Sequence, residues 1–123
     1  MKRYLISFED GAMDHIPTEE MADVDKASHA VMEDAVKAGA YVFGIGVERQ
    51  RASVVAADGT VTDGPDPDAQ RFLGGFVIVD AETREEGLAW AARIADACRC
   101  PQEVRELHYD PETEKMLRRH QGD

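Results

Sequence analysis

The sequence predicts an α+β fold of the ferredoxin-like type, a split β-α-β unit that carries an inserted β-hairpin. Three observations support this class. The chain has 123 residues, which suffice for one hydrophobic core but not for two. Segments with strand and helix periodicity follow one another in the order strand, helix, strand, hairpin, strand, helix, strand. The Asp58-Gly59 pair, a strong signal for a two-residue turn, lies where the hairpin is expected.

The first part of the chain predicts a strand, a helix and a second strand. Residues 3–8 alternate polar and apolar side chains, as a half-buried strand does. A helix is expected to begin at Thr18, a capping residue that two glutamates follow, and to end at Gly39. Its apolar residues recur every three or four positions, so one face is expected to be buried. Residues 40–47 are rich in β-branched and aromatic residues and predict the second strand.

The middle of the chain predicts the hairpin. Residues 52–56 form its first strand, Asp58-Gly59 its turn, and residues 60–62 its return strand. The Asp63-Gly64-Pro65 turn follows, and the acidic and proline residues after it are expected to keep the chain in a loop until the next strand.

The last part predicts a strand, a helix and a final strand. Residues 72–79 form a strand that Asp80 is expected to end. A second helix is expected between Thr83, which acidic residues follow, and Pro101, because a proline disfavours helical backbone in the residue before it. Residues 103–107 alternate again and predict a short last strand.

The predicted organisation leaves one sheet face uncovered. We assign residues 1–108 to the folded domain and residues 109–123 to a polar tail, which is either mobile or a short helix. Both helices are expected on one face of an antiparallel sheet. Tyr41 and Phe43 are expected on one face of their strand and Val42 and Ile45 on the other, so the bare face is expected to be apolar as well. The remedy that we expect is a homodimer in which two sheets pack together and enclose a cleft.

Composition limits the possible partners. A formal net charge of −11 argues against nucleic-acid binding, because phosphate contacts need clustered Lys and Arg. No segment has the 18 or so consecutive apolar residues that a membrane span needs. Residues 1–8 are interpreted as a strand rather than a signal peptide, and we expect a cytoplasmic protein. Cys98 and Cys100 are too close for a relaxed disulfide, and the spacing of His and Cys predicts no metal site.

The run from Val61 to Phe76, VTDGPDPDAQRFLGGF, resembles the signature of the YCII-related or DGPF-domain family. Weaker matches extend over most of the chain, as at Ala89-Trp90-Ala91. The resemblance implies a dimeric α/β barrel made of two ferredoxin-like units. Some relatives are small-molecule enzymes, including a dehydrochlorinase that acts on chlorinated hydroquinones, and many are encoded near extracytoplasmic-function sigma factors. The chain departs from the family pattern at Asp66, where the family has Phe, which implies either a more polar cleft or that Phe72 takes this place.

Asp63 and His29 are the candidate catalytic residues. A carboxylate before Gly-Pro lies on a constrained turn, and beside an apolar cleft it could act as a general acid or base. The alternative for Asp63 is a bond to the amides of its own turn. One branch of the family pairs a histidine of the first helix with an aspartate, and the resemblance gives His29 this role. The alternative for His29 is a half-exposed surface residue. His15, Arg49 and Phe72 are candidates for substrate binding.

Two functions follow from these residues. The first is a cofactor-free enzyme that uses acid-base chemistry, as lyases and isomerases do, on a small molecule in the cleft of a homodimer. The second is a non-catalytic module that binds a small ligand or has a regulatory role, which the resemblance links to sigma-factor regulation. They differ in one respect, since catalysis requires Asp63 and His29 to face the cleft, within reach of a bound ligand.

Overall fold

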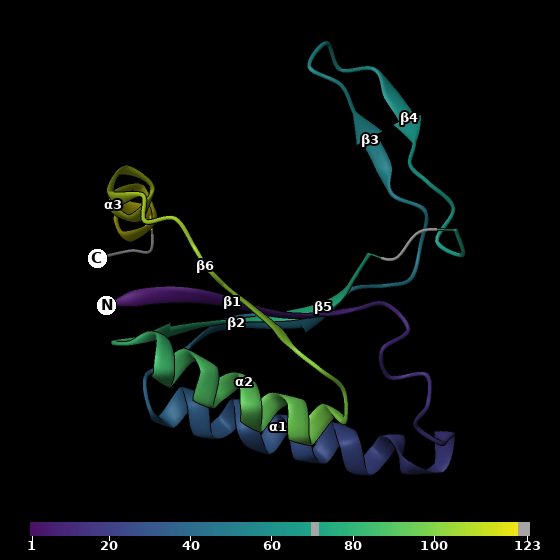
Figure 1. Cartoon of the computed structure of the whole chain (residues 1–123). Helices are drawn as coiled ribbons and strands as arrows, with labels where there is room; N and C mark the ends of the chain where they lie inside the picture. The colour runs from purple at the N-terminus through teal and green to yellow at the C-terminus, as the bar shows by residue number, and fades with distance from the viewer. Residues whose placement is uncertain (70–71, 121–123) are drawn as a thin grey trace.

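A computed structural model of the chain describes residues 1–69 and 72–120. Four strands form an antiparallel sheet in the order β2-β5-β1-β6, and two long helices cover one of its faces (Figure 1). The strands of this sheet are β1 (Lys2–Glu9), β2 (Tyr41–Gly46), β5 (Leu73–Ala81) and β6 (Glu103–Glu106). The two helices are α1 (Met21–Lys37) and α2 (Arg84–Cys98). The predicted α+β class and the placement of both helices on one face are therefore confirmed.

The hydrophobic core lies between the sheet and these two helices. Tyr4 and Ile6 alternate along β1 and are fully buried, as is Val79 of β5. Ile94 of α2 completes the centre of the cluster. Gly87 allows α2 to approach closely, because a Cβ at this position would lie 3.0 Å from the Tyr4 ring. The core thus uses one set of alternate strand positions and leaves the other set facing away from the helices.

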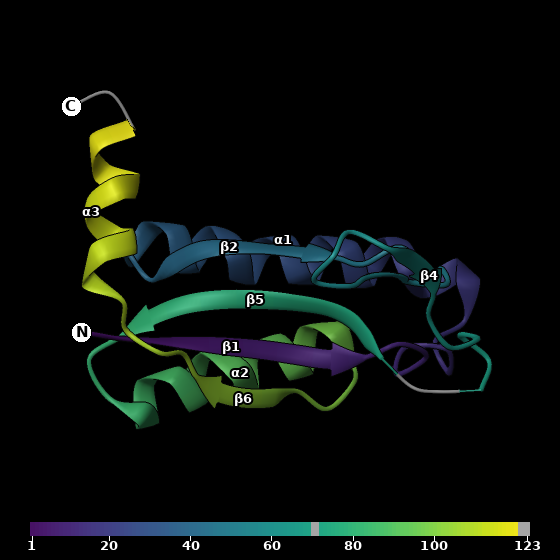
Figure 2. The ribbon, with the colours of Figure 1, turned by 90° about the horizontal axis from the view of Figure 1, so that it is seen from above.

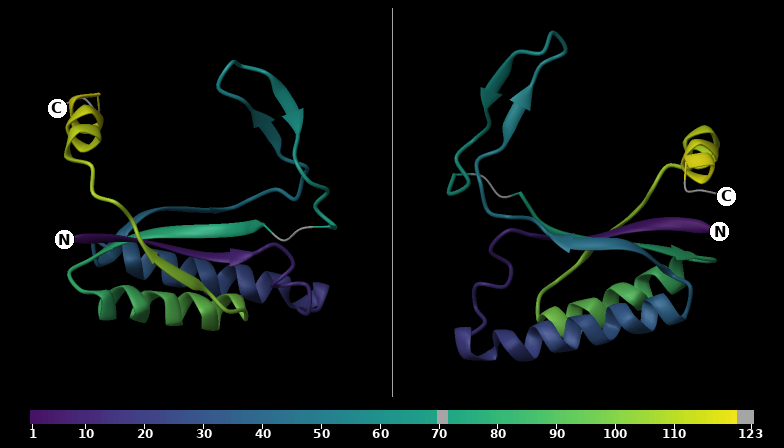
Figure 3. Two further views of the ribbon diagram at one scale, coloured as in Figure 1. Left: turned by 45° about the horizontal axis from the view of Figure 1, so that its top comes forward. Right: turned by 180° about the vertical axis from the view of Figure 1, so that it is seen from behind.

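Two segments rise from the opposite side of the sheet, one at each end (Figures 1 and 2). The first is a ribbon of two strands, β3 (Ser53–Val55) and β4 (Val61–Asp63), which we call the arm together with its flanks at residues 47–69. The second is α3 (Pro111–His120), which begins after β6. The tilted view and the view from behind show the arm and α3 on the same side of the sheet, at its opposite ends (Figure 3).

The sheet face that α1 and α2 do not cover is called the open face. It carries Phe43 and Ile45 of β2, which are 54% and 60% exposed. Phe76 and Ile78 of β5 lie beside them, and the Phe43 and Phe76 ring centroids are 6.2 Å apart. Leu5 of β1 pairs with Ile78 on the same face. In the single chain, the apolar side chains of this layer that are exposed, such as Phe43 and Ile45, are in contact with solvent.

Two predictions about the ends of elements were wrong, and a third had left two alternatives open. Thr18 does not cap α1, because Pro17 starts a single 3₁₀ turn (Thr18–Glu20) and α1 begins after it without a side-chain cap. Asp80 does not end β5, because it pairs with Arg3 across the sheet and the strand runs on to Ala81. The segment after β6, predicted as a mobile tail or a short helix, contains α3. No helix of the described residues is long and apolar enough to cross a bilayer.

Candidate functional site

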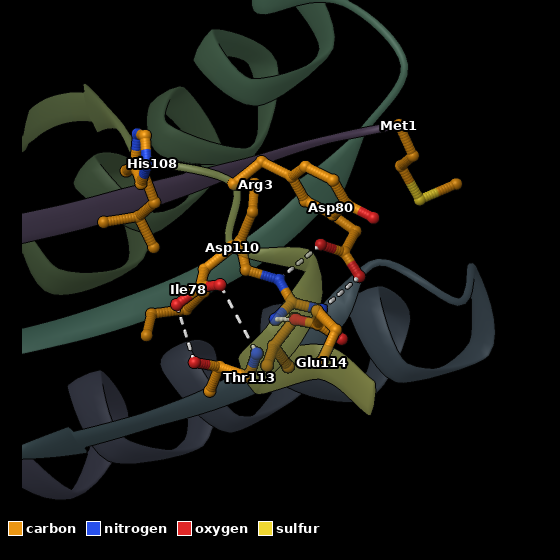
Figure 4. Close-up of a pocket in the computed structure, with 11 residues that line it drawn as sticks. Met1, Arg3, Ile78, Asp80, His108, Asp110, Thr113 and Glu114 are labelled. Atoms are coloured by element: carbon orange, nitrogen blue, oxygen red, sulfur yellow. Dashed lines mark hydrogen bonds and ion pairs between the residues drawn. The ribbon is translucent and has the colours of Figure 1, made fainter. Parts of the chain in front are cut away.

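A pocket of about 480 Å³ lies between the open face and the start of α3 (Figure 4). Its apolar lining includes Val42 and Ile78 from the sheet and Leu107 from the segment that leads to α3. Its charged lining comes from Arg3 and Asp80, on neighbouring strands, together with residues of α3. The site therefore combines an apolar floor with a charged cluster on one wall, which is the usual composition of small-molecule sites.

Arg3 is the centre of the charged cluster. Its Nε donates to Asp80 Oδ1 at 2.8 Å and its Nη2 to Asp80 Oδ2 at 3.2 Å, so the pair is bidentate. Its Nη1 donates to Glu114 Oε1 at 3.0 Å, which ties α3 to the sheet (Figure 4). The hydrogen bond to Asp80 is the main reason that the pKa of Arg3 is raised. Two carboxylates face one guanidinium, so the cluster carries excess negative charge.

Asp110 fixes the N-terminus of α3 beside the pocket. Its Oδ2 accepts from the Thr113 hydroxyl at 2.7 Å, and its Oδ1 accepts from the backbone N–H of Glu112 at 3.1 Å. These bonds, the Thr113 hydroxyl first, lower the pKa of Asp110, so its carboxylate stays ionised. Pro111 occupies the first turn, where a missing N–H has no cost. The exposed side chain of His108 also lines the pocket.

The base of the arm is held by arginines. Arg49 is hydrogen-bonded to Asp10, which follows β1, and to Asp68, which lies in the C-terminal flank of the arm. Arg51 Nη1 donates to the Gly64 carbonyl at 2.8 Å, and its Nη2 lies 3.5 Å from Asp66 Oδ2. Arg49 is predicted to contact a substrate, but in the structure its guanidinium is hydrogen-bonded to two carboxylates of the same chain. Asp66 also holds this turn, since its Oδ1 accepts from the backbone N–H of Asp68 at 2.9 Å.

Asp63 lies at the end of β4, exposed on the arm. Its carboxylate makes no hydrogen bond or ion pair with another described residue, and it lines neither the pocket under α3 nor the groove described next. The turn that follows it is tight, because a Cβ on Gly64 would lie 3.0 Å from the Ala52 carbonyl oxygen. Asp63 therefore lies beside a tight turn and lines neither the pocket under α3 nor the groove beside His29.

His29 is an exposed residue of α1 and lines a groove on the helix side of the sheet. Tyr41, Met32 and Cys98 share this groove, which measures about 360 Å³. Burial raises the pKa of the Cys98 thiol to about 11, so this thiol stays protonated and unreactive at neutral pH. The arm rises from the other side of the sheet (Figure 1), so a single chain does not bring His29 and Asp63 together.

The other predicted residues are placed separately. His15 is exposed in the loop between β1 and α1, whose buried anchor is Ile16. Phe72 is half-buried next to β5 and lines a hollow of about 370 Å³ on the sheet, with Leu5 and Arg105 among its neighbours.

The signature residues serve close packing. A Cβ on Gly75 would lie 2.7 Å from the Phe8 ring, and one on Gly74 would lie 2.9 Å from the Asp10 nitrogen. The Gly-Gly pair therefore lets β5 pass close to β1 and the loop after it. The residues of the pocket under α3 carry no comparable sequence signal. Arg3 and Asp80 are polar side chains that interrupt apolar strands, and this is the one pattern that could have drawn attention to them.

The described residues contain no group of three or more His, Cys, Asp or Glu side chains that could hold a metal ion. A family model described as the YCII-related domain matches residues 3–106 of the chain. No curated protein matches the chain.

Proposed function

We propose that this chain, which belongs to the YCII-related family, is a homodimeric module that binds a small molecule at the open face. The pocket between Arg3, Ile78 and α3 is the proposed site. The observation that carries the proposal is this pocket, with its apolar floor and its charged cluster in one place.

The dimer is supported by the exposure of the open face. Phe43 and Ile45 are each more than half exposed there, although they belong to a strand of the main sheet. The strand order β2-β5-β1-β6, with both long helices on the other face, fits a ferredoxin-like unit. Two such sheets packed about 10 Å apart would bury the apolar layer and form a dimeric α/β barrel.

Binding is favoured over catalysis because of where the proposed catalytic residues lie. Acid-base chemistry needs titratable groups within hydrogen-bond reach of one ligand. Asp63 is on the arm, whereas His29 is on the helix side of the sheet. A lyase or isomerase that uses this pair would have to assemble it from two chains, and His29 would still face away from the open face.

The ligand that fits best is a compact molecule with an apolar body and one polar group. The apolar body would contact Val42 and Ile78, and the polar group would meet Arg3 and its two carboxylate partners. A regulatory role, in which the ligand changes how the dimer presents α3, fits the same site because Glu114 links α3 to Arg3.

A thermal-shift screen of metabolite-sized compounds tests this proposal. Compounds that stabilise the wild type should lose their effect in Arg3→Gln, and in Val42→Phe, which fills the pocket without removing a charge. Arg93→Gln is the matched control, because Arg93 pairs with Asp34 on the surface far from the pocket. Unchanged shifts in both pocket variants would contradict the proposed site. Loss of the shift in Asp63→Asn and His29→Ala alone would instead support the acid-base enzyme.

A further inference from the structure

The arm is a surface that the single chain does not cover. Among the described residues its two strands pair only with each other, and an isolated two-stranded ribbon is marginally stable in water. Val54, Val55 and Val61 are 49%, 65% and 62% exposed on it. α3 is uncovered in the same way, since none of its residues is buried and Met116 and Leu117 are about half exposed.

The arm and α3 carry opposite charges. Asp58 and Asp63 are exposed on the arm, and no described residue forms an ion pair with either. Arg118 and Arg119 are exposed at the end of α3, where Lys115 adds a third cation, and they too have no ion-pair partner among residues 1–69 and 72–120. Each segment therefore presents apolar side chains together with a charge that the other complements.

The length of the arm decides what it can reach. Residues 53–58 extend by about 3.3 Å each, so the tip lies roughly 20 Å from the base, whereas packed sheets are only about 10 Å apart. An arm of this length must pass beyond the sheet of a second copy and lie along one end of it. The end that it meets depends on the direction of the two-fold axis.

Two arrangements are possible, and charge distinguishes them. An axis parallel to the strands would place arm against arm and α3 against α3, so that like charges meet in both contacts. An axis across the strands would place the arm of each copy at the α3 end of the other, because the arm and α3 stand at opposite ends of one sheet (Figure 2). Only the second arrangement pairs the acidic arm with the basic helix.

We infer that the arm of each copy docks on α3 of a second copy and forms the outer wall of the pocket that Arg3, Ile78 and α3 leave open. This inference rests on the proposed homodimer and adds its symmetry and the missing part of the site. A standard interface takes roughly 800 Å² from each partner, which is about a tenth of the 8651 Å² surface of the chain.

Charge reversal tests the contact. Arg118→Glu with Arg119→Glu reverses α3, and Asp58→Lys with Asp63→Lys reverses the arm. Each double variant should raise the dimer dissociation constant at least about tenfold in low salt, because each contact occurs twice and attraction becomes repulsion. A chain that carries all four changes should regain a dissociation constant close to that of the wild type. Sedimentation velocity over a dilution series measures these constants.

The control is Lys26→Glu with Arg84→Glu, two exposed cations on α1 and α2 whose reversal changes the net charge as the α3 variant does. The control should dimerise as the wild type does. If the wild type dimerises but the arm and α3 variants behave like the control, or if the fourfold variant fails to recover, the arm-to-α3 contact is refuted and the proposed site stands. A monomeric wild type refutes both.

Discussion

Replacing Phe43 with alanine measures how much the open face contributes to association. Phe43 is 54% exposed in the single chain, and full burial of a Phe side chain stabilises by about 1.5–3 kcal/mol. The exposed half is therefore worth about 0.8–1.6 kcal/mol in each chain. A two-fold interface uses the residue twice, so Phe43→Ala should weaken the dimer by about 1.6–3.2 kcal/mol, which is about 15- to 200-fold in the dissociation constant.

Sedimentation velocity over a dilution series gives the dissociation constant, and far-ultraviolet circular dichroism establishes that the variant remains folded. The matched control is Val36→Ala, because Val36 is 58% exposed but lies on α1, on the other side of the sheet. The control should leave association unchanged. Equal dissociation constants for Phe43→Ala, Val36→Ala and the wild type would refute burial of the open face in a dimer.

Two further predictions concern stability of the single chain. Gly75→Ala should lower the free energy of unfolding by about 1–3 kcal/mol in a urea titration, because the new Cβ would lie 2.7 Å from the Phe8 ring. Gly46→Ala in the same sheet should cost much less, since its Cβ would meet only the Gly74 oxygen at 4.0 Å, and equal losses in the two variants would contradict this packing. Burial raises the pKa of Cys98 from 9.0 to about 11, so the folded chain keeps a proton that the unfolded chain releases, and stability should fall as pH rises over this interval. Cys98→Ala should reduce that alkaline loss, and an identical pH profile for the variant would show that the thiol is not buried.

The elements of the main sheet could be predicted because each has a strong local signal. Gly39 follows α1 with a φ of +74°, and Gly59 in the hairpin turn has a φ of +90°, as the sequence predicts for both. Asp80 was misplaced because an aspartate is usually a strand breaker, and its cross-strand partner Arg3 is 77 residues away. Local propensity cannot anticipate a long-range ion pair that keeps a charged residue inside a strand.

The candidate site could not be predicted from the sequence because its residues are also far apart along the chain. Glu114 meets Arg3 across 111 residues, and nothing in the spacing of either residue indicates that they meet. His29 and Asp63 are candidates because of their residue types and the family resemblance. Neither property determines on which side of a sheet a residue lies. Residue type alone makes Arg49 a candidate for an anion site, but its hydrogen bonds to Asp10 and Asp68 cannot be read from the sequence.

The central claim is that the open face is covered by a second copy of this chain. Sedimentation equilibrium of the wild type at micromolar concentration tests it most directly, because the mass depends on neither shape nor ligand. We predict about twice the 13.6 kDa of one chain. A mass of 13.6 kDa that persists as the concentration rises would contradict the account.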